Sequence, residues 1–163
     1  MMRKREEHGI DPVYDENSEI LILGSFPSVR SRAEGFFYGH PRNRFWRVMA
    51  AVFGEDVPRS IEEKKAFLLC NRVALFDVLA ECEIEGSADG SIREALPNDL
   101  TPILEKSKIR RIFVNGKTAE KLYQKHLLPK TGIPAFCLPS TSPANAAVSE
   151  ERLIEAWQEI KRR

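Results

Sequence analysis

The amino-acid sequence predicts an α/β fold, a three-layer α/β/α sandwich around a four-stranded, mostly parallel sheet. Along the 163 residues, short and wholly apolar runs alternate with segments in which apolar residues recur at helical spacing. Such runs are typical of parallel strands that are buried on both faces and joined by helices. The length suits one hydrophobic core, so we expect residues 1–163 to form a single domain.

The expected elements follow from these two patterns. Four apolar runs are predicted strands, at 20–24, 73–79, 111–114 and 135–138. Helical spacing predicts helices at 43–53, 61–69, 99–106 and 117–126, and a last helix after Ser149. Ser60 and Ser149 are expected N-caps, because glutamates that suit the positive end of a helix follow each of them.

The composition is that of an ordinary globular domain. Hydrophobic residues make up 42% of the chain, enough for one core, and charged residues 30%. No run approaches the roughly 18 apolar residues of a membrane-spanning helix, and residues 1–9 lack the apolar stretch of a signal peptide. We therefore expect a cytoplasmic monomer without a membrane partner. The net charge of +1 neither indicates nor excludes a nucleic-acid partner.

The cysteines and histidines give no sign of a metal or cofactor. Cys70, Cys82 and Cys137 are far apart, and their odd number without CxxC spacing argues against a disulfide framework or a zinc site. The three histidines are equally scattered. We expect buried or half-buried thiols and a protein that works without a metal or other cofactor.

The loops after the predicted strands are the expected binding site, because open parallel sheets bind ligands at the carboxyl ends of their strands. The first loop, from Gly24 to Trp46, is longer than most connections and lacks the phosphate-binding glycine patterns. It carries Phe36, Phe37 and Tyr38 in a row. Such flat side chains either plug the end of the sheet or give a flipped-out base a surface to stack on.

Five short motifs resemble one enzyme family, in the same order. They are GSFPS at 24–28, YGHPRNRFW at 38–46, VALFDVL at 73–79, NGK at 115–117 and LPSTSPANA at 138–146. Together they resemble the uracil-DNA glycosylase superfamily and, within it, the hypoxanthine-DNA glycosylase family. The resemblance implies a uracil-DNA glycosylase-like fold and a monofunctional DNA-repair enzyme. Such an enzyme flips a deaminated base, above all hypoxanthine, out of DNA and hydrolyses its N-glycosidic bond.

The resemblance implies a catalytic role for Asn43, which orients the water or the sugar. Mismatch-specific members place a catalytic Asn within GINPG, where this chain has Phe26. Asn at the start of a helix is also a common N-cap, and the two roles are compatible. The residues expected to bind the base come from the first loop, its tyrosine and the end of the third strand: Gly24, Ser25, Phe26, Pro27, Ser28, Tyr38 and Asn115.

The last loop is expected to contact DNA. Its hydroxyls and Lys117 suit phosphate oxygens, and Pro143 with Ala144 suits an apolar wedge in the minor groove. The full set is Lys117, Ser140, Thr141, Ser142, Pro143, Ala144 and Asn145. Asn115-Gly116 followed by Lys117 is equally typical of a turn followed by a solvated lysine.

Leu138 and Asp77 bear on the mechanism. Many relatives carry a His at the position of Leu138, over the departing base, so help for the leaving group must come from elsewhere. We interpret Asp77, inside a predicted strand, as a hydrogen-bond partner and not as the general base. DNA containing a deaminated base is the expected partner.

Two alternatives remain open. The first is a uracil- or mismatch-specific glycosylase on the same fold, which substrate tests distinguish. The second is a nucleic-acid-binding module without catalysis, which would bind DNA but release no base.

Overall fold

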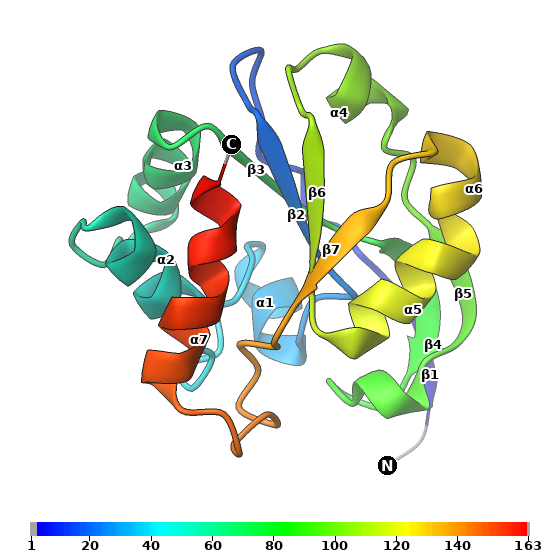
Figure 1. Cartoon of the computed structure of the whole chain (residues 1–163). Coiled ribbons are helices and arrows are strands. Elements are labelled where there is room, and N and C mark those ends of the chain that lie inside the picture. Colours follow the sequence, from blue (N-terminus) through cyan, green and yellow to red (C-terminus); the bar gives the residue numbers. More distant parts are fainter. Residues whose placement is uncertain (1–2, 163) are drawn as a thin grey trace.

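A four-stranded parallel sheet forms the centre of the molecule in a computed structural model that describes residues 3–162 (Figure 1). Its strands are β2 (Ile20–Gly24), β3 (Val73–Asp77), β6 (Arg111–Asn115) and β7 (Ala135–Leu138), in the order β3-β2-β6-β7. Every residue of β2 and β3 is buried, as their apolar sequences predict. Because all four strands are parallel, their carboxyl ends meet at one edge of the sheet.

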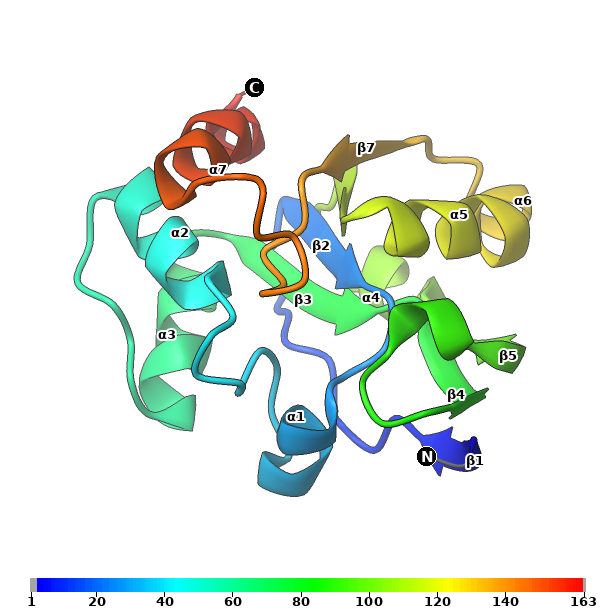
Figure 2. The ribbon, with the colours of Figure 1, turned by 90° about the horizontal axis from the view of Figure 1, so that it is seen from below.

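Helices cover both faces of this sheet, which confirms the predicted three layers (Figure 2). One layer consists of α2 (Phe45–Phe53), α3 (Ile61–Cys70) and α7 (Glu150–Trp157). The other holds α4 (Thr101–Glu105), α5 (Lys117–His126) and α6 (Leu128–Thr131). Ser60 and Ser149 are N-caps as predicted, since their side chains accept hydrogen bonds from the amides of Glu63 and Arg152.

A second, antiparallel sheet was not predicted. It consists of β1 (Lys4–Glu7), β4 (Leu79–Ile84) and β5 (Arg93–Pro97), in the order β1-β4-β5. The sequences KREE and REALP are polar and lack the alternation that marks a half-buried strand. The fold is completed by the short helix α1 (Val29–Glu34) and by two 3-10 turns, η1 (Asp89–Ser91) and η2 (Gln158–Lys161).

The prediction of one strand over 73–79 is wrong at its end. The chain leaves the parallel sheet after Asp77, and Leu79 begins β4 of the antiparallel sheet. The amide of Asn98 holds this bend, because its Nδ2 donates to the carbonyl oxygens of Asp77 at 2.9 Å and Leu79 at 3.0 Å. The apolar run VALFDVL continues through the bend, so the sequence pattern does not reveal it.

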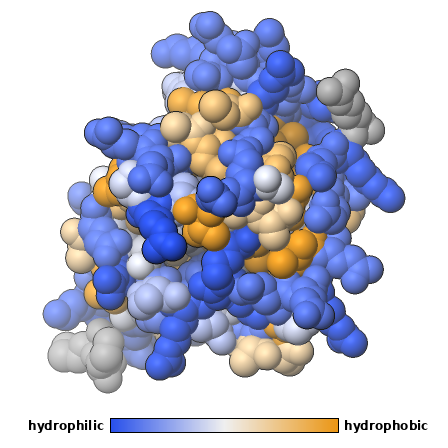
Figure 3. Space-filling model, turned by 90° about the vertical axis from the view of Figure 1, so that its left-hand side faces the viewer, coloured by the Kyte–Doolittle hydropathy of each residue, from blue (hydrophilic) through white to orange (hydrophobic). Residues whose placement is uncertain are grey.

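The packing of α7 closes one side of the core. Figure 3 shows the side of the molecule that carries α2, α3 and α7, where hydrophilic side chains surround smaller apolar areas. Leu153 and Trp157 of α7 are fully buried, and the ring of Trp157 meets Phe45 of α2 edge to face. None of the helices within residues 3–162 combines the length and apolar character needed to span a membrane.

Leu153→Ala should lower the free energy of unfolding by about 2–5 kcal/mol, because it leaves a cavity where a fully buried side chain packs α7 onto the core. Urea denaturation measures this change. Glu155→Ala, at an exposed position of the same helix, should change stability by no more than about 0.5 kcal/mol. Equal effects of the two substitutions would contradict the placement of α7.

Candidate active site

A cavity of about 340 Å³ lies at the carboxyl ends of the four parallel strands. Segments that follow each strand line it, together with two residues of the loop between β4 and β5. These lining residues include Gly24–Ser28, Tyr38, His40, Asn43, Asp77, Ser87, Asp89, Asn115 and Ser140–Ala144. Figure 2 looks onto this edge of the sheet and shows the loop between β7 and α7 near the middle of the view.

The structure brings most of the predicted site residues together. All seven residues expected to bind the base line the cavity, and so do Asn43 and Ser140–Ala144. Lys117 and Asn145 do not line it. Lys117 is exposed at the start of α5, and Asn145 closes its own loop by donating from Nδ2 to the carbonyl of Ser140 at 3.0 Å. Their contacts with DNA stay predictions.

Asn43 has its carbonyl oxygen fully engaged. Its Oδ1 accepts from the backbone amide of Phe45 and from the hydroxyl of Thr141, each at 2.9 Å. The first of these bonds serves the start of α2, so Asn43 contributes to capping although the boundary residue is Arg44. An amide oxygen with both lone pairs occupied leaves the Nδ2 amino group as the part that can bind a ligand in the cavity.

Thr141 connects Asn43 to Asn115. Its side chain is completely buried, its Oγ accepts from Asn115 Nδ2 at 3.0 Å, and its amide donates to Asn115 Oδ1 at 3.0 Å. Since the hydroxyl proton of Thr141 is donated to Asn43, we regard Thr141 as a residue that positions Asn43. Its predicted contact with DNA stays a prediction.

Tyr38 stands at the floor of the cavity in a strained backbone conformation, with φ of 55°. Phe45 covers one face of its ring, with 4.0 Å between centroids and an interplanar angle of 15°. Its hydroxyl accepts from Asn115 Nδ2 at 3.2 Å, which leaves its proton free to be donated. Burial, and then the charge of Asp77, raise the pKa of Tyr38, so the hydroxyl keeps this proton. Stacking of a base on Tyr38 stays a prediction.

Gly24 allows this close approach. A Cβ atom at Gly24 would lie 2.9 Å from the hydroxyl oxygen of Tyr38 and would collide with Oδ1 of Asp77. Both polar groups therefore converge above the glycine that ends β2. A side chain here would fill the floor of the cavity.

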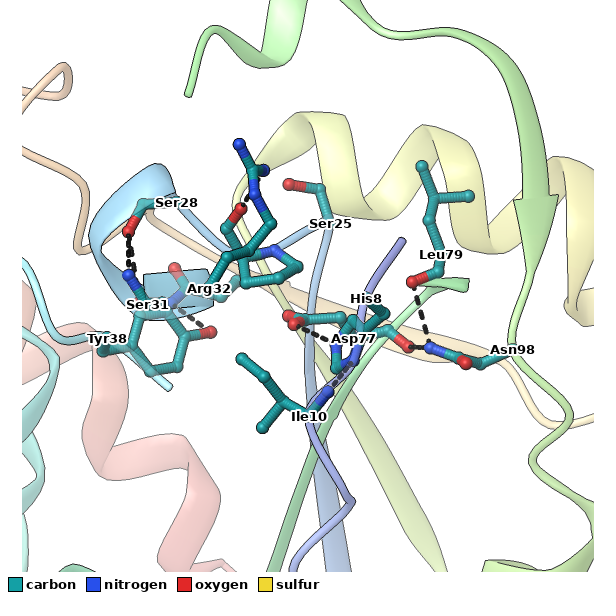
Figure 4. A network of polar contacts seen from close by, with 12 residues as sticks. His8, Ile10, Ser25, Ser28, Ser31, Arg32, Tyr38, Asp77, Leu79 and Asn98 are labelled. Atoms are coloured by element: carbon teal, nitrogen blue, oxygen red, sulfur yellow. Dashed lines mark hydrogen bonds and ion pairs between the residues drawn. The ribbon is translucent and has the colours of Figure 1, made fainter. Parts of the chain in front are cut away.

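Asp77 is held by a histidine that the sequence analysis did not connect to the site (Figure 4). His8 Nε2 lies 2.8 Å from Asp77 Oδ2, and both side chains are buried. His8 Nδ1 accepts from the amide of Ile10 at 3.2 Å, which holds the imidazole in place with its Nε2 toward Asp77. The pair therefore fixes the carboxyl group of Asp77, whose Oδ1 faces Gly24 and the cavity.

Asp89 adds a second carboxylate from the loop between β4 and β5. Its Oδ1 accepts from the hydroxyl of Ser25 at 2.9 Å, which draws the carboxylate toward the loop after β2. Desolvation, and then the charge of Asp77, raise the pKa of Asp89, while the hydrogen bond from Ser25 opposes this shift. The sequence around Asp89 has no motif that would have identified it.

The loop after β7 is fastened to the rest of the site by Arg44. Its guanidinium donates to the carbonyl of Val148 at 2.6 Å and to those of Asn145 at 3.0 Å and Ser142 at 3.4 Å. Trp157 Nε1 also donates to the carbonyl of Pro139 at 2.9 Å. The loop that was expected to enter the minor groove is thus anchored at several points, with Pro143 and Ala144 exposed between them.

Leu138 does not lie over the cavity. It ends β7, is 1% exposed and does not line the cavity. The expectation that Leu138 replaces a polar group above the base is therefore wrong, because the side chain points into the core. Within residues 3–162, no group of three or more His, Cys, Asp and Glu side chains is arranged to hold a metal ion.

The fold and site together define an α/β protein with a pocket, lined by apolar surface and several polar side chains, at the carboxyl ends of a parallel sheet, the usual ligand site of this class. The chain belongs to the uracil DNA glycosylase superfamily, whose family model matches residues 12–161.

Individual relatives cover almost the whole chain. A hypoxanthine DNA glycosylase of Methanosarcina acetivorans is 39% identical and covers 96% of this chain and 98% of its own length. One from Methanosarcina barkeri is 31% identical, with 97% and 99% covered. The solution NMR structure of a Methanosarcina acetivorans protein, described as a candidate uracil DNA glycosylase, matches with a TM-score of 0.78. It shares 36% identity and covers 96% of this chain and 99% of its own.

Thr141→Val should lower the free energy of unfolding by about 1–3 kcal/mol, although the shape of the side chain is kept. The substitution removes the donor to Asn43 and an acceptor from Asn115 within a buried network. Chemical denaturation measures the loss, and Thr118→Val in α5 is the matched control. A loss no larger than that of the control would mean that the network adds nothing to stability.

Proposed function

We propose that this protein is a monofunctional DNA glycosylase that removes hypoxanthine from DNA and leaves an abasic site. One observation carries the proposal: the cavity floor pairs an acceptor, Asp77 Oδ1, with donors from Tyr38 and Asn43. Deamination of adenine creates an N–H group beside a carbonyl oxygen, which is the complementary pattern. The names of the two full-length relatives support the same substrate.

The carboxylate of Asp77 would distinguish hypoxanthine from adenine. N1 of hypoxanthine carries a proton that Asp77 Oδ1 can accept, whereas N1 of adenine presents a lone pair. A buried acceptor facing a second acceptor loses its hydrogen bond and is strongly disfavoured. Donors such as Tyr38 Oη and Asn43 Nδ2 would take the O6 oxygen or the sugar. Adenine would therefore be rejected by unpaired polar groups and not by size.

The remaining lining residues suit hydrolysis of a flipped nucleotide. Flipping costs a few kcal/mol and is easiest at a mispair such as hypoxanthine opposite thymine. Pro143 and Ala144 are exposed where a wedge would fill the vacated position in the duplex. No lysine lines the cavity among the residues that the structure describes, so we propose water and not an amine as the nucleophile.

A substrate panel tests the proposal. Duplexes carrying hypoxanthine opposite thymine, uracil opposite guanine, xanthine or a thymine mismatch are incubated with excess protein in EDTA, then treated with alkali or left untreated. We expect hypoxanthine to be released at least about tenfold faster than uracil, roughly 1.4 kcal/mol of transition-state preference. Strand breaks should require alkali, because the enzyme is proposed to lack lyase activity.

Two results would contradict this picture. Equal rates for uracil and hypoxanthine would favour a uracil- or mismatch-type enzyme on the same fold. Binding without release of any base would favour a nucleic-acid-binding module.

Asn43→Ala should lower single-turnover release of hypoxanthine by about 10²-fold or more, the usual value for a group that assists the reaction directly. DNA binding should change little. Loss of the capping bond alone would cost only about 1 kcal/mol of stability.

Asn43→Ser separates the two roles, because a serine can still cap α2 but has no amide to present to the cavity. Melting temperature and release rate are measured for both variants. If Asn43→Ser restores both stability and activity, Asn43 acts only as a cap.

A further inference from the structure

The cavity is lined by acidic and not by basic side chains. The carboxyl groups of Asp77 and Asp89 line it, and no Lys or Arg does so among residues 3–162. His8 holds Asp77 through Oδ2 from outside the cavity lining. In the part of the chain that the structure describes, His40 is the one histidine that lines the cavity, and it is exposed.

This charge restricts how a base can leave. As the N-glycosidic bond breaks, the sugar becomes positive and the base becomes negative unless it receives a proton. Carboxylates in a site of low dielectric stabilise the positive sugar but repel an anionic base. A base that is protonated as it leaves departs neutral and avoids this repulsion. Purines have a basic ring nitrogen, N7, that can accept such a proton, whereas uracil has no equivalent.

We propose that Asp89 is a catalytic general acid that protonates N7 of the departing purine. This inference rests on the proposed removal of hypoxanthine and identifies the leaving-group assistance in that reaction. Asp89 lines the cavity from the loop between β4 and β5, and its hydrogen bond with Ser25 holds the carboxyl group at the edge where the base enters. Asp77 is committed to His8 through Oδ2, so Asp89 is the carboxyl group free of a buried partner base.

The proton balance is simple. The proton of the Asp89 carboxyl group passes to N7 while the bond between C1′ and N9 breaks, and the bond electrons stay with the base. Water then adds to C1′, and the proton that it loses returns through solvent to the Asp89 carboxylate. The products are neutral hypoxanthine and the abasic sugar, and the enzyme regains its starting state.

The groups around Asp89 together raise its pKa above the ordinary value of a carboxyl group. Burial and the negative charge of Asp77 at the end of β3 raise the pKa of Asp89, and the hydroxyl of Ser25 after β2 lowers it. Arg32 and Arg93 donate to backbone carbonyls of the same loop, at Gly86 and Gly90. A raised pKa extends the acid form to higher pH, and the rate should fall as pH rises through that value.

Asp89→Asn should reduce single-turnover release of hypoxanthine by about 10²-fold or more and abolish the fall in rate at high pH. Glu94→Gln on β5, which removes a carboxylate outside the cavity, should leave both unchanged. Ser25→Ala should keep the pH-dependent fall but move it to higher pH, because the bond that lowers the pKa is gone. A merely structural role for the Ser25–Asp89 bond predicts the same defect in both variants and would overturn the proposal.

A modified substrate tests the atom that receives the proton. In 7-deaza-deoxyinosine, carbon replaces N7, so the wild-type enzyme should release this base slowly and Asp89→Asn should cause little further loss. An undiminished effect of Asp89→Asn on the deaza substrate would refute protonation at N7. If the wild-type protein releases no hypoxanthine at all, the proposed function fails. If it does release hypoxanthine and Asp89→Asn is equally fast, only this inference fails.

Discussion

A partly buried chain of hydrogen bonds from Asn43 through Thr141 and Asn115 to Tyr38 is the constraint on which the site depends. Its members come from the residues just before α2, the loop after β7, the end of β6 and the loop between α1 and α2 that carries Tyr38. No member can rotate without leaving a buried polar group unpaired, which is costly in a site of low dielectric. The donors that face the cavity are therefore oriented before any DNA binds, as precise catalysis requires.

The antiparallel sheet brings a second kind of group to the same cavity. His8 directly follows β1 and holds Asp77, while Asp89 lies between β4 and β5 and reaches Ser25. The parallel sheet thus supplies neutral donors, and the antiparallel sheet positions the negative charge. His8 precedes the part of the chain that the family model matches, residues 12–161.

The sequence predicted the parallel sheet and most of the cavity for a physical reason. Strands buried on both faces must be apolar throughout, and parallel strands must bring their following loops to one edge, so apolar runs locate both. The residues that it missed act through tertiary contacts without a local pattern. His8 and Asp77 are 69 residues apart, and the bend after Asp77 depends on the distant amide of Asn98. Arg44 was part of a motif, but its three carbonyl partners lie about a hundred residues away.

The charge of the cavity offers an explanation of base preference that the residues at positions 26 and 138 do not. Phe26 does line the cavity, but Leu138 points into the core and cannot affect the base directly. A site that stabilises an anionic pyrimidine needs positive charge near the departing base, whereas this cavity presents Asp77 and Asp89. The negative charge of the pocket favours the positive sugar equally for every substrate, so it cannot discriminate through the sugar. Discrimination must arise at the base, where a purine can accept a proton and leave neutral while uracil must leave against the field of the pocket.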